Sequence, residues 1–257
     1  MKRLATFLLL LLVAAAPARQ RPTLFLIGDS TMADKPDPDR NPERGWGQML
    51  PRFLDGEVAV RNHAVNGRSS KSFIDEGKWD AVLAQLGPGD YVLIQFGHND
   101  AVKEKVDRYT PPADYRANLV RFVSETRAKG ATPVLLTPVV RRRFDESDAL
   151  VDTHGEYPDI VRAVAAEDGV PLFDMHRESA RVLRELGRDR SRRLFLHLAA
   201  GEHPNYPGGV TDDTHFSPYG ARVMAELFLD GLGGLSGELA RHMRPVSSQP
   251  QPPEATP

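Results

Sequence analysis

Thr23-Leu24-Phe25-Leu26-Ile27-Gly28-Asp29-Ser30-Thr31 is the stretch of this 257-residue sequence that decides the fold. Residues 23–27 suit a buried strand and run directly into Gly-Asp-Ser-Thr, which predicts a strand that ends in a tight turn and presents a hydroxyl group there. A serine in such a turn is by itself typical of a helix N-cap, because Gly, Asp and Ser are ordinary turn residues. Whether Ser30 is a nucleophile therefore depends on what later segments contribute.

The composition limits the class of protein. The chain has 40% hydrophobic and 26% charged residues, which is typical of one globular domain. Its 33 Lys and Arg against 35 Asp and Glu give a formal net charge of −2, so no nucleic-acid partner is indicated. The absence of cysteine excludes disulfides, thiolate nucleophiles and cysteine-based metal sites.

The two ends of the sequence differ from the rest. Lys2 and Arg3 precede a leucine-rich apolar run from Leu4 to Ala16, and Ala16-Pro17-Ala18 is a small-x-small cleavage motif. We expect residues 1–18 to be a secretory signal peptide, because the run is shorter than the roughly 20 residues of a membrane span; an uncleaved anchor is the alternative. The mature protein would then be secreted or periplasmic, without a membrane association. Residues 247–257 have nothing to bury and are a predicted disordered tail, which leaves residues 19–246 as the folded domain.

The middle of the chain alternates strand-like and helix-like segments. The predicted strands are short, apolar and bounded by Gly, Pro or Asp: 24–27, 58–62, 91–96, 133–137 and 170–173. The predicted helices lie between and after them: 47–53, 79–86, 114–128, 157–167, 177–186 and 217–229. This alternation predicts an α/β fold with a parallel sheet covered by helices on both sides. The carboxyl ends of the strands then meet at one edge, where sites form in such sheets.

Polar turns follow the first three predicted strands at that edge. They are residues 28–31, 66–70 and 97–100, and each offers a polar side chain or a free backbone amide. Residues 211–216 are predicted to open the final helix and supply a carboxylate and an imidazole three positions apart. Together these groups are a nucleophile, a base, an orienting acid and oxyanion donors, which is what acyl transfer requires.

Four blocks of sequence resemble the SGNH (GDSL-type) hydrolase superfamily. They are Gly-Asp-Ser-Thr-Met-Ala at 28–33, Asn-Gly-Arg-Ser-Ser-Lys-Ser-Phe at 66–73, Phe-Gly-His-Asn-Asp at 96–100 and Asp-Asp-Thr-His-Phe-Ser at 212–217. Within the superfamily they are similar to the rhamnogalacturonan acetylesterase branch, and the similarity runs from about Thr23 to Leu229. The resemblance implies a three-layer α/β/α, flavodoxin-like SGNH hydrolase fold with a five-stranded parallel sheet, which agrees with the strand count above.

The resemblance also implies roles for individual residues. Ser30 would attack the ester carbonyl, His215 would act as the general base, and Asp212 would orient the imidazole. Asp213 is the neighbouring alternative. We favour Asp212, because the family places its acid three residues before the histidine. The oxyanion hole would consist of the backbone amides of Ser30 and Gly67 and the side-chain amide of Asn99.

Other charged and imidazole side chains are weaker candidates. The remaining histidines occur in unrelated segments and without a His-Glu-x-x-His motif, so no metal site is predicted. His98 lies inside a matched block and either lines the site or is a hydrogen-bonded turn residue. Arg141, Arg142 and Arg143 follow the fourth predicted strand and form either a solvated basic loop or a contact for the uronate carboxylates of a pectic chain.

The sequence thus predicts an exported serine esterase that removes acetyl groups from a plant cell-wall polysaccharide, with rhamnogalacturonan as the first choice. Such an enzyme would need no cofactor, and we expect it to act as a monomer on an acetylated polysaccharide partner. The alternatives are the same chemistry on acetylated xylan, another glycan or a small or lipid ester, and a non-catalytic carbohydrate-binding protein. An α/β-hydrolase lipase is disfavoured, because no Gly-x-Ser-x-Gly motif occurs in the chain.

Overall fold

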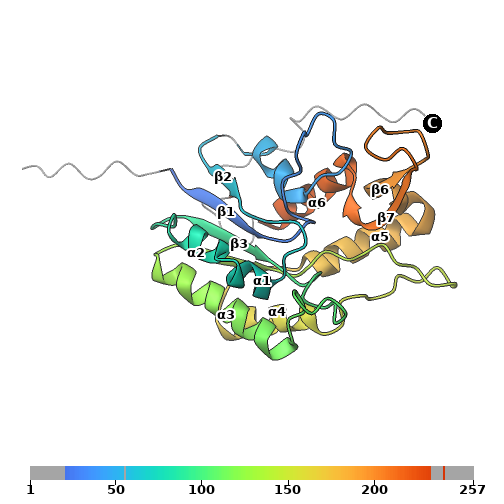
Figure 1. Ribbon diagram of the computed structural model, residues 1–257. Coiled ribbons are helices and arrows are strands. Elements are labelled where there is room, and N and C mark those ends of the chain that lie inside the picture. Colours follow the sequence, from blue (N-terminus) through green and yellow to red (C-terminus); the bar gives the residue numbers. More distant parts are fainter. Residues whose placement is uncertain (1–20, 55, 233–239, 241–257) are drawn as a thin grey trace, which may run out of the picture.

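A computed structural model describes residues 21–54, 56–232 and 240 (Figure 1). The predicted signal peptide, 1–18, and the predicted tail, 247–257, lie outside these residues. None of the helices within the described part of the chain has the length and apolar character needed to cross a membrane.

The described residues form a five-stranded parallel sheet, as the sequence predicts. The strands are β1 (Thr23–Gly28), β2 (Ala59–Asn62), β3 (Tyr91–Gln95), β4 (Thr132–Leu136) and β5 (Leu172–Phe173). Their order in the sheet is β2-β1-β3-β4-β5, so β1 and β3 lie side by side at the centre, and each neighbouring pair is parallel. All five carboxyl ends therefore lie at one edge.

Helices cover both faces of the sheet, which gives the expected three layers (Figure 1). One face carries α1 (Ser70–Asp75), α2 (Lys78–Leu83), α3 (Pro112–Ala128) and α4 (Tyr157–Glu167). The other carries the 3₁₀ helix η1 (Trp46–Arg52), α5 (Met175–Ser191) and α6 (Pro218–Leu232). A short 3₁₀ turn, η2 (Arg192–Leu194), leads from α5 into an antiparallel pair, β6 (Phe195–Leu198) and β7 (Val210–Phe216).

The layers follow from the two-residue period of the strands. In β1, Leu24 and Leu26 pack into the core on the α6 side, whereas Phe25 and Ile27 pack into the core on the α3 side. Both sets of side chains are almost completely buried, and each such residue contributes roughly 1.5–3 kcal/mol of hydrophobic stabilisation. A central strand that is apolar at every position is thus a strand with helices on both sides.

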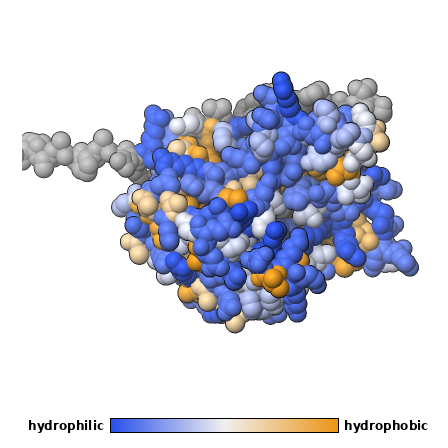
Figure 2. All heavy atoms as spheres, viewed as in Figure 1, coloured by the Kyte–Doolittle hydropathy of each residue, from blue (hydrophilic) through white to orange (hydrophobic). Residues whose placement is uncertain are grey.

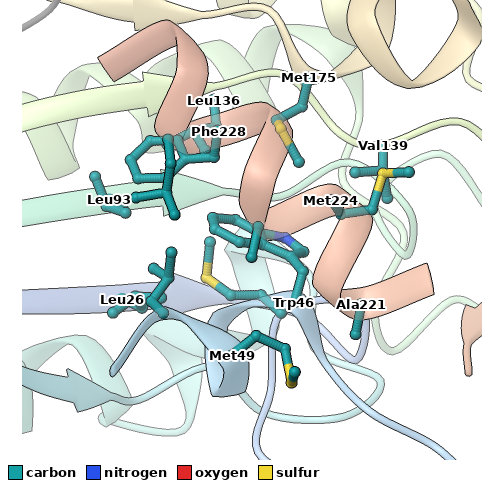
Figure 3. Close-up of a cluster of buried hydrophobic side chains, with 14 of the residues drawn as sticks. Leu26, Trp46, Met49, Leu93, Leu136, Val139, Met175, Ala221, Met224 and Phe228 are labelled. Atoms are coloured by element: carbon teal, nitrogen blue, oxygen red, sulfur yellow. The ribbon is translucent and has the colours of Figure 1, made fainter. Parts of the chain in front are cut away.

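Trp46 fixes η1 against the centre of the sheet (Figure 3). Its indole packs against Phe228 of α6, with ring centroids 5.5 Å apart, and its Nε1 donates a hydrogen bond to Gln95 Oε1 at 2.8 Å. The flanking glycines permit this contact: a Cβ atom on Gly45 would lie 2.1 Å from the carbonyl oxygen of Ala33. The backbone amide of Trp46 also donates to the Thr31 carbonyl at 2.9 Å, so η1 supports the turn that follows β1.

Three elements, α1, β6 and β7, are absent from the sequence-based expectation. Residues 211–216 do not open the final helix; they belong to β7, and α6 begins only at Pro218. The helix α1 and the strands β6 and β7 were not predicted at all. β7 consists mostly of polar residues and β6 has only four residues, and the two strands gain their stability from pairing with each other.

Candidate active site

The turn after β1 holds Ser30 at the carboxyl edge of the sheet, where it is 8% exposed and lines a cavity. The buried carboxylate of Asp29 accepts hydrogen bonds from the Thr31 backbone amide at 2.9 Å and from the Thr31 hydroxyl at 2.8 Å. Burial raises the pKa of Asp29, and the bonds from Thr31 partly oppose that rise. The turn therefore has a fixed shape, and Ser30 is directed towards β7.

The strand β7 presents Asp212 and His215 through a break in its ladder. Leu196 pairs with Asp212 and Phe195 with Phe216, so the three residues between these β7 positions bulge out of the ladder. In this bulge Asp212 Oδ1 accepts the backbone amides of Thr214 and His215, at 2.8 and 2.9 Å. The carboxylate of Asp212 thus folds back on the backbone of His215 inside a strand, and not at the start of a helix.

Ser30, His215 and Asp212 form one hydrogen-bonded chain. His215 Nε2 lies 2.9 Å from Ser30 Oγ, and His215 Nδ1 lies 2.7 Å from Asp212 Oδ2. Burial raises the pKa of Asp212, but the bonds from His215 outweigh it and lower that pKa to about 2. Burial lowers the pKa of His215, but hydrogen bonding to Asp212 outweighs it and the net pKa is raised. This is the arrangement of a nucleophile, a base and an orienting carboxylate.

Asp213 has different partners from Asp212. Its Oδ1 lies 2.7 Å from Arg142 Nη1 and 2.8 Å from His197 Nε2, and its carbonyl oxygen accepts the Arg142 backbone amide at 2.8 Å. Asp213 thus ties β7 to the segment after β4, while Asp212 is the carboxylate that contacts His215.

Two of the three candidate oxyanion donors, Gly67 and Asn99, line the same cavity as His215. This cavity has a volume of about 620 Å³, and Ser30, Gly67, Asn99 and His215 all line it. Gly67 has a φ of +74°, a conformation that favours glycine. Asn99 Nδ2 donates to the Arg68 carbonyl at 3.0 Å, which leaves its second N–H available to a ligand.

A buried carboxylate holds these two turns together. Asp100 Oδ1 accepts the backbone amide of Ser70 at 2.9 Å and its hydroxyl at 2.6 Å, while Oδ2 accepts the Gly97 amide at 3.0 Å. Burial raises the pKa of Asp100 to about 6, against these hydrogen bonds, which lower it. The turns after β2 and β3 are therefore fixed relative to one another.

His98 and Arg141 also line the cavity, as the sequence suggested they could. Arg141 Nη2 donates to the His98 carbonyl at 2.9 Å, and His98 Nδ1 lies 3.2 Å from His154 Nε2. Burial holds the pKa of His98 well below its ordinary value, and the nearby His154 lowers it further. His98 is therefore a neutral, hydrogen-bonded residue in the wall.

The other two arginines of the basic segment differ from Arg141 and from each other. Arg142 is buried, and its guanidinium donates to Asp213 and also to the carbonyl of Arg188 and the hydroxyl of Ser191. Arg143 is exposed and lines a second cavity beside the first. Arg141, Arg142 and Arg143 therefore do not share one role, either as a solvated basic loop or as a substrate contact.

The fold brings together histidines that are far apart in sequence. Asp152, His154 and His176 have possible ligand atoms that all lie within 4.8 Å of one another, so this group could hold a metal ion. However, Arg141 Nη1 lies 3.5 Å from His154 Nε2, and the positive end of α5 begins beside His176. Both charges oppose a bound cation.

Sequence reasoning missed four charged residues that surround Ser30. Lys35 is 3% exposed, and its Nζ contacts the Ser30 carbonyl, Asn66 Oδ1 and Glu43 Oε1 at 2.7, 2.6 and 2.7 Å. Glu43, Lys105 and Arg108 line the cavity. No motif distinguishes these residues, since they come from loops that only the fold brings together.

Comparison with known proteins identifies the family to which the chain belongs. Residues 26–223 match the GDSL-like lipase/acylhydrolase family. Rhamnogalacturonan acetylesterase RhgT of Bacillus subtilis is 42% identical over 220 residues, which cover 86% of this chain and 93% of RhgT. The probable rhamnogalacturonan acetylesterase YesY of the same organism is 35% identical, over 81% of this chain and 91% of YesY.

Solved structures agree with this placement. The crystal structure of Bacillus subtilis YxiM superposes with a TM-score of 0.72 at 27% identity and covers 84% of this chain, which spans only 58% of that one. An acetylxylan esterase from Geobacillus stearothermophilus shares the fold, with a TM-score of 0.58 at 23% identity over 82% of this chain and 94% of its own. The chain therefore belongs to the GDSL-like lipase/acylhydrolase family of the SGNH superfamily, on the branch that contains RhgT and YesY.

Proposed function

We propose that this protein is an exported serine esterase that removes acetyl groups from a pectic polysaccharide, with rhamnogalacturonan as the substrate. The observation that carries the proposal is the hydrogen-bonded chain from Ser30 through His215 to Asp212 at the wall of a 620 Å³ cavity. The names of RhgT and YesY support the choice of substrate.

In this proposal the reaction has two halves. Ser30 Oγ attacks the acetyl carbonyl carbon while His215 Nε2 takes the hydroxyl proton, and Asp212 stabilises the resulting imidazolium. The backbone amides of Ser30 and Gly67 and the Asn99 side chain donate to the oxyanion. His215 then protonates the departing sugar oxygen, and a water molecule releases acetate from Ser30 by the same route in reverse. These residues supply all the steps, so the proposed reaction uses no cofactor.

The experiment measures acetate release by the purified mature protein. Its substrates are acetylated rhamnogalacturonan, acetylated xylan and a small aryl acetate, with Ser30→Ala as the control variant. We expect the highest kcat/KM on rhamnogalacturonan and loss of acetate release in the control. A preference for xylan would move the enzyme to the second substrate class, and no release from any substrate would favour a carbohydrate-binding protein.

Export is tested separately. N-terminal sequencing of the protein recovered outside the cytoplasm should begin near residue 19, because Ala16-Pro17-Ala18 is the cleavage motif. Recovery of the intact chain, with Met1, from the cytoplasm would refute a cleaved signal peptide.

A further inference from the structure

Two cavities meet beside the reacting serine. The first contains Ser30 and His215, and the second, of about 580 Å³, lies next to it over the segment that follows β4. Arg141 and Thr214 line both cavities, so the two cavities adjoin at these residues and are together called the groove. A polymer bound with one residue at Ser30 can therefore extend into the second cavity.

The groove carries cationic side chains that have no ion-pair partner among the described residues, although the buried Asp29 carboxylate acts electrostatically on Arg141. Lys105, Arg108 and Arg141 line the first cavity, and none of them forms an ion pair within the described part of the chain. The acidic side chain in the same wall, Glu43, is already paired with the buried Lys35 at 2.7 Å. The first cavity is thus cationic, although the whole sequence has a formal net charge of −2.

The second cavity contains one further uncompensated cation. Arg142 and Arg188 are paired with Asp213 and Asp148, respectively. Arg143 is exposed and forms no ion pair with any described residue. This differs from much of the remaining surface, where arginines are paired with carboxylates: Arg116 with Glu167, Arg121 with Glu125, and Arg181 with Glu185.

We propose that this groove binds the carboxylates of a uronate-containing chain whose reacting ester lies at Ser30. Lys105 and Arg108 would hold a uronate in the first cavity, and Arg143 would hold one in the second. A guanidinium or ammonium group that faces a cavity without a partner matches the carboxylate of a uronic acid, whereas a neutral xylan backbone offers nothing for it to pair with. Hydrophilic residues predominate on the face of the molecule in Figure 2. This inference rests on the proposed function and specifies its substrate as an anionic chain.

Substitutions of Lys105, Arg108 and Arg143 differ in how directly they test the inference. Arg108 Nη1 also lies 3.4 Å from Asn99 Oδ1, and a Cβ on Gly67 would lie 3.0 Å from the same nitrogen. Replacing Arg108 would therefore disturb the oxyanion donors. Lys105 and Arg143 are exposed side chains without such contacts, so their removal reports on substrate charge.

The test compares acetylated rhamnogalacturonan oligosaccharides with the same oligosaccharides after reduction of their carboxyl groups to alcohols. We expect the kcat/KM of the unmodified protein to fall by about ten- to a hundredfold on reduction, mainly through KM. Lys105→Ala and Arg143→Ala should each shrink this ratio several-fold, and the double variant should bring it close to one. Lys103→Ala and Arg184→Ala are charge-matched controls, because both residues are exposed and line neither cavity.

Three outcomes would overturn the inference. Equal kcat/KM on both forms would exclude carboxylate binding, while the esterase assignment would stand. A ratio that Lys105→Ala and Arg143→Ala change no more than the control variants do would exclude these two residues as the contacts. Cleavage of the aryl acetate without release from either oligosaccharide would overturn both the groove and the proposed pectic substrate.

Discussion

Lys35 Nζ lies 2.7 Å from the carbonyl oxygen of Ser30 and joins the two sides of the active site. The same ammonium group contacts Asn66 Oδ1, next to Gly67, and Glu43 Oε1 in the cavity wall. Lys35 is buried, so three oxygen acceptors replace its hydration shell. The position of Ser30 relative to the Gly67 amide thus depends on a side chain that takes no part in the bond changes.

We expect Lys35→Met to lower kcat by about ten- to a hundredfold, because a displacement of the nucleophile by about 1 Å costs that much. The substitution leaves Glu43 and Asn66 without their partner, so the melting temperature should also fall. The measurements are kcat on an aryl acetate and thermal unfolding. Lys71→Met is the control, since the Lys71 side chain is 42% exposed and its ion pair among the described residues is with Asp75. A normal kcat in a folded Lys35→Met protein would show that Lys35 has no positioning role.

Asp212→Asn should lower kcat by about 10⁴-fold, a magnitude known for the equivalent change in another Ser-His-Asp enzyme. An asparagine can present an N–H to His215 Nδ1, which favours the wrong imidazole tautomer and removes the charge that stabilises the imidazolium. The fold should remain, because the asparagine Oδ1 can still accept the amides of Thr214 and His215. Steady-state kinetics on an aryl acetate measures the effect.

Asp213→Asn is the matched comparison on the neighbouring residue. We expect kcat to change less than tenfold, since Asp213 contacts Arg142 and His197 and not His215. Stability should fall by about 1–3 kcal/mol, less than for a fully buried pair because the Asp213 side chain is 42% exposed. The opposite pattern, with Asp213→Asn inactive and Asp212→Asn active, would assign the acid to Asp213.

Asn99→Ala should lower kcat by about two to three orders of magnitude with little change in melting temperature. The loss of one oxyanion donor typically costs about 2.7–4 kcal/mol of transition-state stabilisation. Asn205→Ala, in an exposed loop outside the cavity, is the control. A nearly normal kcat would remove Asn99 from the oxyanion hole.

The sequence predicted the layers of this fold because its signals are local. The continuous apolar run of β1 and the three- and four-residue spacing of Tyr115, Leu119 and Phe122 in α3 each need only one segment. The boundaries of α4 match the prediction at both ends. β6 and β7 could not be predicted in this way, because β6 is only four residues long and β7 is mostly polar, and such segments are stable as strands only when the two pair with each other.

The site was predictable only where a motif marks it. The blocks around Ser30, Gly67, Asn99 and His215 do converge on one cavity. Lys35 and Glu43 carry no such mark, because a buried ion pair depends on a contact between two loops. Arg142 resembles its two arginine neighbours in sequence, and only burial against Asp213 separates it from them.

The pH dependence of kcat/KM should distinguish the charges around His215. The base must be neutral, and its pKa is raised above the ordinary 6.5, so we expect the rate to fall as the pH drops through a midpoint above that value. Glu43 raises the pKa of His215 and Lys35 lowers it. Glu43→Gln should therefore move the acidic limb to lower pH, and Lys35→Met should move it to higher pH. Profiles on an aryl acetate, which does not titrate in this range, measure both shifts. If the two variants moved the limb in the same direction, these charges would not set the pKa of the base.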